Sequence, residues 1–282
     1  MADEAAISVR GLTKHYGKSR ALDGLDLEVR QGEIFSLLGP NGAGKTTTVE
    51  ILEGYRSRDG GEVSVLGADP GRPPHGWRSR IGIVLQSVND AAELTVDEMV
   101  THFACYYPSP RDPGEVIELV GLTEKRKART RQLSGGQRRR LDVALGILGR
   151  PELLFLDEPT TGFDPEARRQ FWALIRRLND ENTTILLTTH YLEEAEALAD
   201  RVGVVSAGRL LAVEKPSELG GRDTATATVS WQGPNGFEAR ATDTPTQVVA
   251  ELARQFAGEV PGLTVRRPSL EDVYLTMIGA TP

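Results

Sequence analysis

One glycine-rich segment constrains what this 282-residue chain can fold into more than any other feature. It reads Gly39-Pro40-Asn41-Gly42-Ala43-Gly44-Lys45-Thr46-Thr47 and matches Gly-x-x-x-x-Gly-Lys-Thr, a loop that cradles phosphate groups. The apolar run at 33–38 predicts a buried strand before the loop. The residues after Lys45 predict a helix. A strand, this loop and a helix in that order form the context in which the motif binds phosphate.

The chemistry of the loop follows from its residue types. Glycines allow successive backbone N–H groups to converge into an anion-binding nest, and the positive end of the following helix dipole adds to the field. Lys45 supplies a positive charge for the β- and γ-phosphates. Thr46 supplies a hydroxyl for Mg²⁺. We therefore predict that residues 39–47 bind a nucleotide.

Two further motifs narrow the interpretation. Leu133-Ser134-Gly135-Gly136-Gln137 predicts a second anion-binding helix start, with a capped helix start as the alternative. The apolar run 153–156 is followed by Asp157 and Glu158. This is the pattern of a strand whose terminal aspartate holds Mg²⁺ beside a nucleotide.

Together these motifs resemble the ATPase subunit of an ABC transporter, from about Ile7 to Leu219. The resemblance implies hydrolysis of ATP with Mg²⁺ as cofactor. It also implies that Ser134, Gly135, Gly136 and Gln137 bind the ATP held by the opposite subunit of a head-to-tail homodimer. Thr46, Gln86 and Asp157 would be the metal ligands.

The resemblance extends to the residues that would carry out catalysis. Glu158 is the candidate general base for the attacking water, and Gln86 and His190 would orient that water or contact the γ-phosphate. Tyr16 stands where the family stacks the adenine ring, although an aromatic half-buried at a sheet edge is the alternative. Asp164 matches a dimer-contact loop. In that loop Thr161 and Phe163 replace the more usual Ser and Leu.

The order of the predicted elements gives an α/β fold class. We expect a P-loop ABC ATPase domain over residues 1–220, with a mostly parallel sheet, an antiparallel β layer and a helical insert at about 87–135. Thr95 and Glu98 form a capping-box signature at the start of a helix in that insert. Residues 221–282 should form a small C-terminal α+β extension.

The C-terminal extension has its own signals. Thr244-Pro-Thr-Gln247 predicts a helix start with a capping box, and Ser269 begins another capped helix. The apolar stripe of the first helix must be buried within the small domain or against a second subunit. The Ser269-to-Val273 segment resembles the C-terminal extension of ATPases in daunorubicin-resistance-type drug exporters. A packed structural tail is compatible with the same residues.

Composition excludes several classes of protein. The net charge of −7 argues against general nucleic-acid binding, and no specific nucleic-acid partner is expected. No run approaches the roughly 20 apolar residues that span a bilayer, and the first residues lack a secretory signal pattern. The single Cys105 excludes an internal disulfide, and we expect it to be a packing residue on a helix rather than a nucleophile. We expect a protein on the cytoplasmic face of the membrane, held there by a partner.

The leading hypothesis is an ATPase subunit that energises export of a substrate, such as a drug or another hydrophobic compound, through a separate integral membrane permease. One alternative is a soluble ABC ATPase that acts on nucleic acid or the ribosome. Such proteins usually carry long coiled coils, zinc-binding cysteines or two ATPase halves, and this sequence has none of them. Another alternative is a nonhydrolysing, nucleotide-dependent regulatory module. Glu158, Gln86 and His190 argue against it.

Overall fold

The computed structural model describes residues 5–84, 93–234 and 236–279, which form two compact units. One unit comprises Met1–Val213 and the other Glu214–Pro282. None of the helices in the described ranges is both long and apolar enough to cross a membrane.

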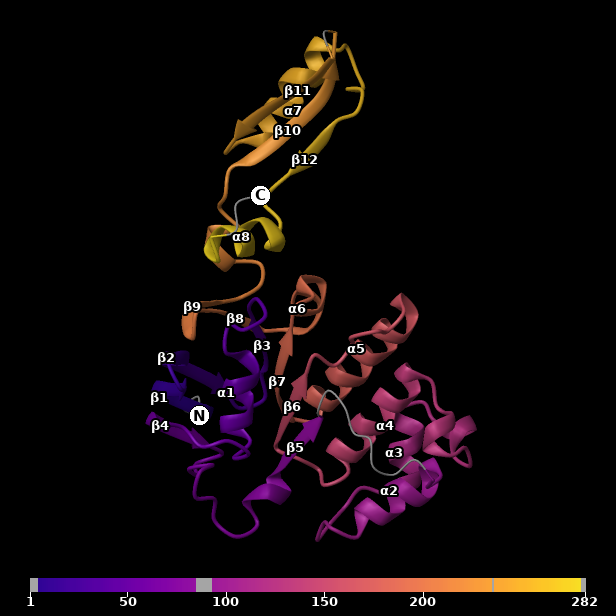
Figure 1. Ribbon diagram of the computed structural model, residues 1–282. Helices are drawn as coiled ribbons and strands as arrows, with labels where there is room; N and C mark the ends of the chain where they lie inside the picture. Colours follow the sequence, from indigo (N-terminus) through magenta and orange to yellow (C-terminus); the bar gives the residue numbers. More distant parts are fainter. Residues whose placement is uncertain (1–4, 85–92, 235, 280–282) are drawn as a thin grey trace. The chain divides into compact units, whose positions relative to one another are not determined.

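A six-stranded sheet forms the centre of the first unit (Figure 1). Its strands, in spatial order, are β5 (Ile81–Val84), β6 (Leu153–Asp157), β7 (Thr184–Thr189), β3 (Ile34–Leu38), β8 (Arg201–Ser206) and β9 (Arg209–Glu214). The neighbours from β5 to β8 run parallel. Parallel strands end at the same edge, so the residues after β3, β6 and β7 are brought together in space.

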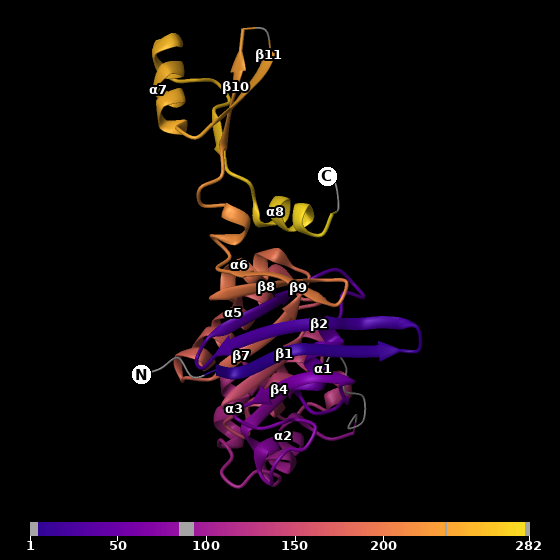
Figure 2. The same ribbon diagram turned by 90° about the vertical axis from the view of Figure 1, so that its left-hand side faces the viewer.

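An antiparallel layer covers one face of this sheet, as the sequence predicts. It consists of β2 (Ser19–Arg30), β1 (Ala5–Tyr16) and β4 (Gly60–Val65), and Figure 2 shows the long β1–β2 hairpin. The helix α1 (Lys45–Leu52) packs between the two layers. Alternate residues of each central strand face this core; Phe35 and Phe155, for example, are fully buried in it.

The opposite face is covered by helices, which Figure 1 shows beside the sheet. They are α2 (Val96–Ala104), α3 (Pro113–Leu119), α4 (Gly135–Ile147), α5 (Pro165–Asp180) and α6 (Leu192–Leu198). The predicted capping box of Thr95 and Glu98 starts α2. Cys105, which caps the other end of α2, is exposed, so the expectation that it is a packing residue is wrong. It stands one residue beyond the buried stripe of its helix, which ends at Ala104.

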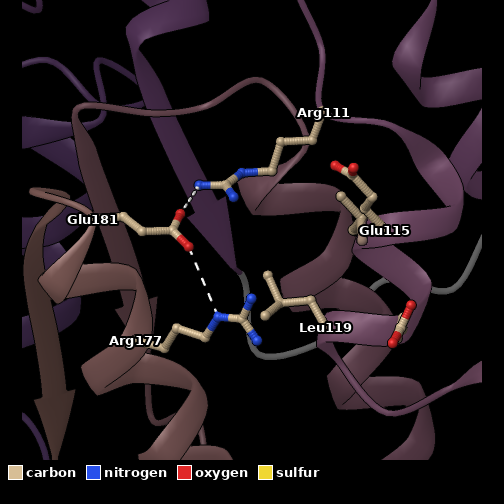
Figure 3. Close-up of a pocket in the computed structure, with 7 residues that line it drawn as sticks. Arg111, Glu115, Leu119, Arg177 and Glu181 are labelled. Carbon is tan, nitrogen blue, oxygen red and sulfur yellow. Dashed lines mark hydrogen bonds and ion pairs between the residues drawn. The ribbon is translucent and has the colours of Figure 1, made fainter.

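The helical insert is tied to the core by an ion-pair network around Glu181 (Figure 3). Arg111, just before α3, donates a hydrogen bond of 2.7 Å to Glu181 Oε2. Arg177 Nε, on α5, lies 3.8 Å from Glu181 Oε1. These charges border a cavity of about 510 Å³. Glu181 thus joins the segment before α3 to the C-terminal end of α5.

The second unit is a small α+β domain. Its antiparallel sheet has the order β11 (Gly236–Thr242), β10 (Ala227–Gly233), β12 (Thr264–Arg266), and α7 (Pro245–Gln255) packs on one face. Val248 and Leu252 of α7 are buried against Val229 and Trp231 of β10. The apolar stripe of α7 is therefore buried within its own domain.

The helix caps of the second unit differ from each other. Ser269 and Asp272 form a complete capping box at the start of α8 (Leu270–Met277). The box predicted at Thr244 and Gln247 does not form, because the Thr244 side chain accepts no hydrogen bond from the helix. Thr244 Oγ1 lies 3.4 Å from Thr242 Oγ1 instead. Pro245 does occupy the first helical turn, as expected.

Candidate active site

The glycine-rich loop connects β3 to α1, and two of its glycines are required by close packing. A Cβ on Gly39 would lie 2.4 Å from the carbonyl oxygen of Val205 in β8. Gly44 has a φ of +107°, and a Cβ there would lie 2.7 Å from the carbonyl oxygen of Ala21. Both contacts are closer than non-bonded atoms allow. The loop is consequently packed against β8 and β2. Its end leads into α1, where the first N–H groups of the helix are available to a ligand.

Lys45 is the first residue of α1 and is 6% exposed. Its Nζ donates hydrogen bonds to the carbonyl oxygens of Gly39 (2.6 Å) and Pro40 (3.2 Å). Burial lowers the pKa of Lys45, whereas the nearby charges of Glu158 and Asp157 oppose that shift. The lysine of the loop and the two acids after β6 therefore share one electrostatic environment.

Asp157 ends β6 and is oriented by a threonine of the neighbouring strand. Thr188 Oγ1, in β7, donates a 2.5 Å hydrogen bond to Asp157 Oδ1 and accepts one of 3.1 Å from the backbone N–H of Glu158. Arg139, buried in α4, donates to the carbonyl oxygens of Asp157 and Pro159. Both ends of the turn after β6 are thus fixed by side chains from other elements.

Glu158 adopts a φ of +45°, a left-handed conformation that is rare for residues other than glycine. Such a conformation costs about 1–3 kcal/mol and persists only where the surroundings enforce it. Here the two hydrogen bonds of its N–H to Thr188 enforce it. The Glu158 carboxylate faces His190, whose Nδ1 lies 3.3 Å from Glu158 Oε1.

His190 follows β7, and its side chain is 42% exposed. Its ring packs on Tyr191 at a centroid distance of 4.1 Å. The Arg168 guanidinium lies 4.8 Å from the centre of the Tyr191 ring. His190 is accordingly supported from one side by an aromatic ring and can present its other nitrogen to a ligand.

A second cluster of predicted residues lines a cavity of about 400 Å³. Its lining includes Ser134, Gly135, Gly136, Gln137 and Asp164. Ser134 and Gln137 form a capping box at the start of α4, and Asp164 caps α5. The predicted anion site and the predicted dimer-contact loop therefore lie together.

Phe163 also lines this cavity. It is 8% exposed and packs edge-to-face on Phe171 at a centroid distance of 5.8 Å. Phe163 is larger than the Leu that is more usual at this position, and its ring is accommodated because it extends into the apolar core beside α5.

The remaining predicted site residues are distributed as follows. Pro40, Asn41, Gly42 and Thr46 are exposed, Ala43 is buried and Thr47 is half-buried. Tyr16 ends β1 and is 42% exposed. Gln86 lies outside the described residues.

Comparison with known proteins identifies the group to which the chain belongs. Residues 22–161 match the family described as ABC transporter. Over 97% of this chain and 94% of the relative, it is 39% identical to "Nod factor export ATP-binding protein I" of Ralstonia nicotianae. It is 41% identical to "Daunorubicin/doxorubicin resistance ATP-binding protein" of Streptomyces peucetius, over 94% of this chain and 78% of that one. The chain is an ABC transporter ATPase.

A solved structure agrees with this assignment. A dimeric bacterial ABC transporter cassette is 26% identical and aligns with a TM-score of 0.66, covering 74% of this chain and 98% of that one. The expected family, fold class and ATPase activity are confirmed. The resemblance to daunorubicin-resistance ATP-binding proteins is confirmed as well.

The donor set of this ABC ATPase suits Mg²⁺. Mg²⁺ prefers oxygen ligands and is usually held by one or two carboxylates together with substrate phosphates. Asp157 offers a carboxylate and Thr46 a hydroxyl, both hard oxygen donors. Within the described ranges no three acidic, histidine or cysteine side chains form a metal cluster.

Sequence reasoning did not find three residues that shape the site: Thr188, Arg139 and Tyr191. Thr188 was only one of several polar residues in a buried strand, and Arg139 was one of three consecutive arginines. Neither of these two positions carries a local signal, because each contacts Asp157 from a neighbouring element of the fold. Tyr191 carries none either, since its role is seen only in the packing of its ring on His190.

Proposed function

We propose that this ATPase energises export of a substrate through a separate membrane-spanning subunit. The observation that carries the proposal is the convergence of Lys45, Asp157, Glu158 and His190 at one edge of the parallel sheet. The names of its relatives, which refer to Nod factor export and to daunorubicin resistance, support export. We propose a drug or another hydrophobic compound as the cargo.

ATP binding would use the glycine-rich loop, the start of α1 and the ends of β1 and β6. Residues 39–47 surround the phosphates and donate to them through backbone N–H groups, which every residue of the loop except Pro40 carries, and Lys45 exchanges its carbonyl contacts for phosphate oxygens. Tyr16 stacks on the adenine. Thr46 and Asp157 hold Mg²⁺, with Gln86 as a further ligand. When bound, Mg²⁺ neutralises charge on the phosphates.

Hydrolysis would proceed by in-line attack of water on the γ-phosphorus. Glu158 removes a proton from that water as the new P–O bond forms, and the bond to the β-phosphate oxygen breaks to give ADP and phosphate. His190 bonds the γ-phosphate and, through Nδ1, orients the Glu158 carboxylate. Gln86 helps to position the water. The protein's contribution is mostly positioning and charge stabilisation.

We propose a homodimer in the ATP-bound state. The cavity lined by Ser134, Gly135, Gly136 and Gln137 lies beside Asp164 and would receive the γ-phosphate of ATP held by the second subunit. The dimeric cassette among the solved structures supports this arrangement. Residues 1–220 would form the ATPase domain. Residues 221–282 would form the extension.

The partner would be an integral membrane permease, which would hold the ATPase at the cytoplasmic face of the membrane. Purification from membranes with a tagged chain should recover one multi-span protein together with Mg-ATP hydrolysis. A chain that co-purifies with ribosomes or nucleic acid instead would overturn the transport role.

Lys45→Ala tests the site within the same preparation. It should abolish most ATP binding while the circular dichroism spectrum stays that of a folded protein, because Lys45 provides the charge at the phosphates. Lys127→Ala changes an exposed lysine of the helical insert and allows the general effect of losing one positive charge to be judged. Equal ATP affinity in Lys45→Ala and the unaltered protein would contradict the assignment.

A further inference from the structure

The tip of the β1–β2 hairpin carries an aromatic ring next to two cations. Tyr16 is the last residue of β1 and pairs with Ser19 across the turn. The Arg56 guanidinium carbon lies 5.3 Å from the centre of the Tyr16 ring, and Lys14 Nζ lies 5.8 Å from it. Both distances are within the range of cation–π attraction.

Arg56 is held firmly by the helix that follows the glycine-rich loop. The backbone carbonyl of Glu50, in α1, accepts hydrogen bonds from the N–H groups of Tyr55 (2.9 Å) and Arg56 (3.0 Å). The Glu50 carboxylate also accepts a 2.5 Å hydrogen bond from Arg56 Nε. Because both backbone and side chain are fixed by the same glutamate, little conformational entropy remains to be lost when the guanidinium contacts a ring.

Asp59 fixes the hairpin to the same segment. Its carboxylate accepts hydrogen bonds from Lys14 Nζ (2.8 Å) and from the backbone N–H of His15 (2.6 Å). The backbone N–H of Asp59 donates to the carbonyl oxygen of Thr13 (3.0 Å). Residues 56–59 therefore connect α1, which begins at Lys45, with the hairpin that carries Tyr16.

We propose that Arg56 is a positioning residue for the nucleotide base, acting through Tyr16. This inference rests on the proposed role of Tyr16 as the adenine platform. An aromatic ring at an exposed hairpin tip would otherwise lose rotational freedom when a base stacks on it. The fixed guanidinium restricts the ring beforehand, so that stacking costs less entropy.

The test is a double-mutant cycle on ATP affinity, with inorganic tripolyphosphate as a probe that lacks the base. Arg56→Ala should weaken ATP binding about 5-fold and leave tripolyphosphate binding unchanged. Tyr16→Ala should weaken ATP binding roughly 10-fold. In the Tyr16→Ala background, Arg56→Ala should have no further effect, because the ring through which it acts is gone.

Two more variants separate positioning from a general structural effect. Arg56→Lys keeps a cation near the ring and should restore most of the ATP affinity lost in Arg56→Ala. Arg20→Ala removes an arginine of the same hairpin tip that pairs with Asp23, and it should bind ATP as the unaltered protein does. Thermal melting of each variant checks that it is folded.

The outcomes distinguish this inference from the proposed function on which it rests. Unchanged ATP affinity in Tyr16→Ala would overturn the adenine platform itself. If Tyr16→Ala weakens binding but Arg56→Ala does not, or if the two effects simply add, Arg56 does not act through the ring. A parallel loss of tripolyphosphate affinity in Arg56→Ala would also overturn the inference, since the arginine would then serve the phosphates or the fold.

Discussion

Glu158 and His190 meet across the ends of two neighbouring parallel strands. His190 Nδ1 lies 3.3 Å from Glu158 Oε1, and the left-handed backbone of Glu158 follows directly after β6. The two residues are 32 positions apart in the sequence. They approach each other because β6 and β7 are hydrogen-bonded in register, with Asp157 opposite Thr188.

Replacement of Glu158 should separate ATP binding from hydrolysis. Glu158→Gln keeps the shape of the side chain but cannot accept a proton from water, so turnover should fall by at least about 100-fold. ATP affinity should persist, and light scattering with Mg-ATP should show a dimer. Glu124→Gln, at an exposed position in the helical insert, serves as the matched control. Undiminished turnover in Glu158→Gln, with only monomer in Mg-ATP, would rule out both the base and the ATP-bound dimer.

Thr188 offers a test of how Asp157 is oriented. Thr188→Val removes the hydroxyl that donates to Asp157 Oδ1 and accepts from Glu158 N–H while preserving side-chain volume. We expect hydrolysis to fall roughly 10-fold, with a raised requirement for Mg²⁺ in a titration of activity. Thr188→Ser retains the hydroxyl and should stay close to the unaltered protein. Equal activity of the valine and serine variants would show that the hydroxyl is not needed.

Glu53 should make stability depend on pH. It is 6% exposed at the C-terminal end of α1, and burial, reinforced by Asp157 and Glu50, raises its pKa from 4.5 to about 8. Between these two values the folded protein binds a proton that the unfolded chain releases, so stability is lost as the pH rises toward 8. Glu53→Gln removes this dependence.

The expected change in the free energy of unfolding follows from the shift in the pKa of Glu53, because each pKa unit corresponds to about 1.4 kcal/mol. Between pH 6 and pH 8.5 the free energy of unfolding of Glu53→Gln should rise relative to the unaltered protein by roughly 2–3 kcal/mol. Urea titrations at the two pH values measure this difference. Glu62→Gln, at an exposed position in β4, provides the control. A difference that is the same at both pH values would contradict the raised pKa.

Removal of the second unit should spare nucleotide binding. The two units are separately compact, and the α7 stripe is buried inside the second one. A chain that ends at Glu214, the last residue of β9, should therefore fold and bind ATP through Lys45 and the loop amides. We expect weaker dimerisation or weaker coupling to the membrane partner. A folded truncated chain without any ATP binding would mean that the extension belongs to the site.

Local sequence signals predicted the parts of this structure that depend on short-range interactions. The capping boxes at Thr95 and Ser269 form because donor and acceptor are three residues apart on one helical turn. The same signal failed at Thr244, whose φ and ψ are −120° and 63° and whose hydroxyl lies beside Thr242. A capping motif indicates which hydrogen bonds are available at a helix start. Whether they form depends on the backbone conformation of the residues that lead into the helix.

The sequence by itself determined the glycine-rich loop between a strand and a helix, the acid-tipped strand, the capped start of α4 and the ATPase family, because each resides in a contiguous run of residue types. Only the tertiary structure decided that Thr188 orients Asp157, that His190 faces Glu158 and that Arg56 lies by Tyr16. These contacts join residues that are 31, 32 and 40 positions apart. No periodicity encodes them, since their distances depend on which strands become neighbours and on the register in which those strands pair.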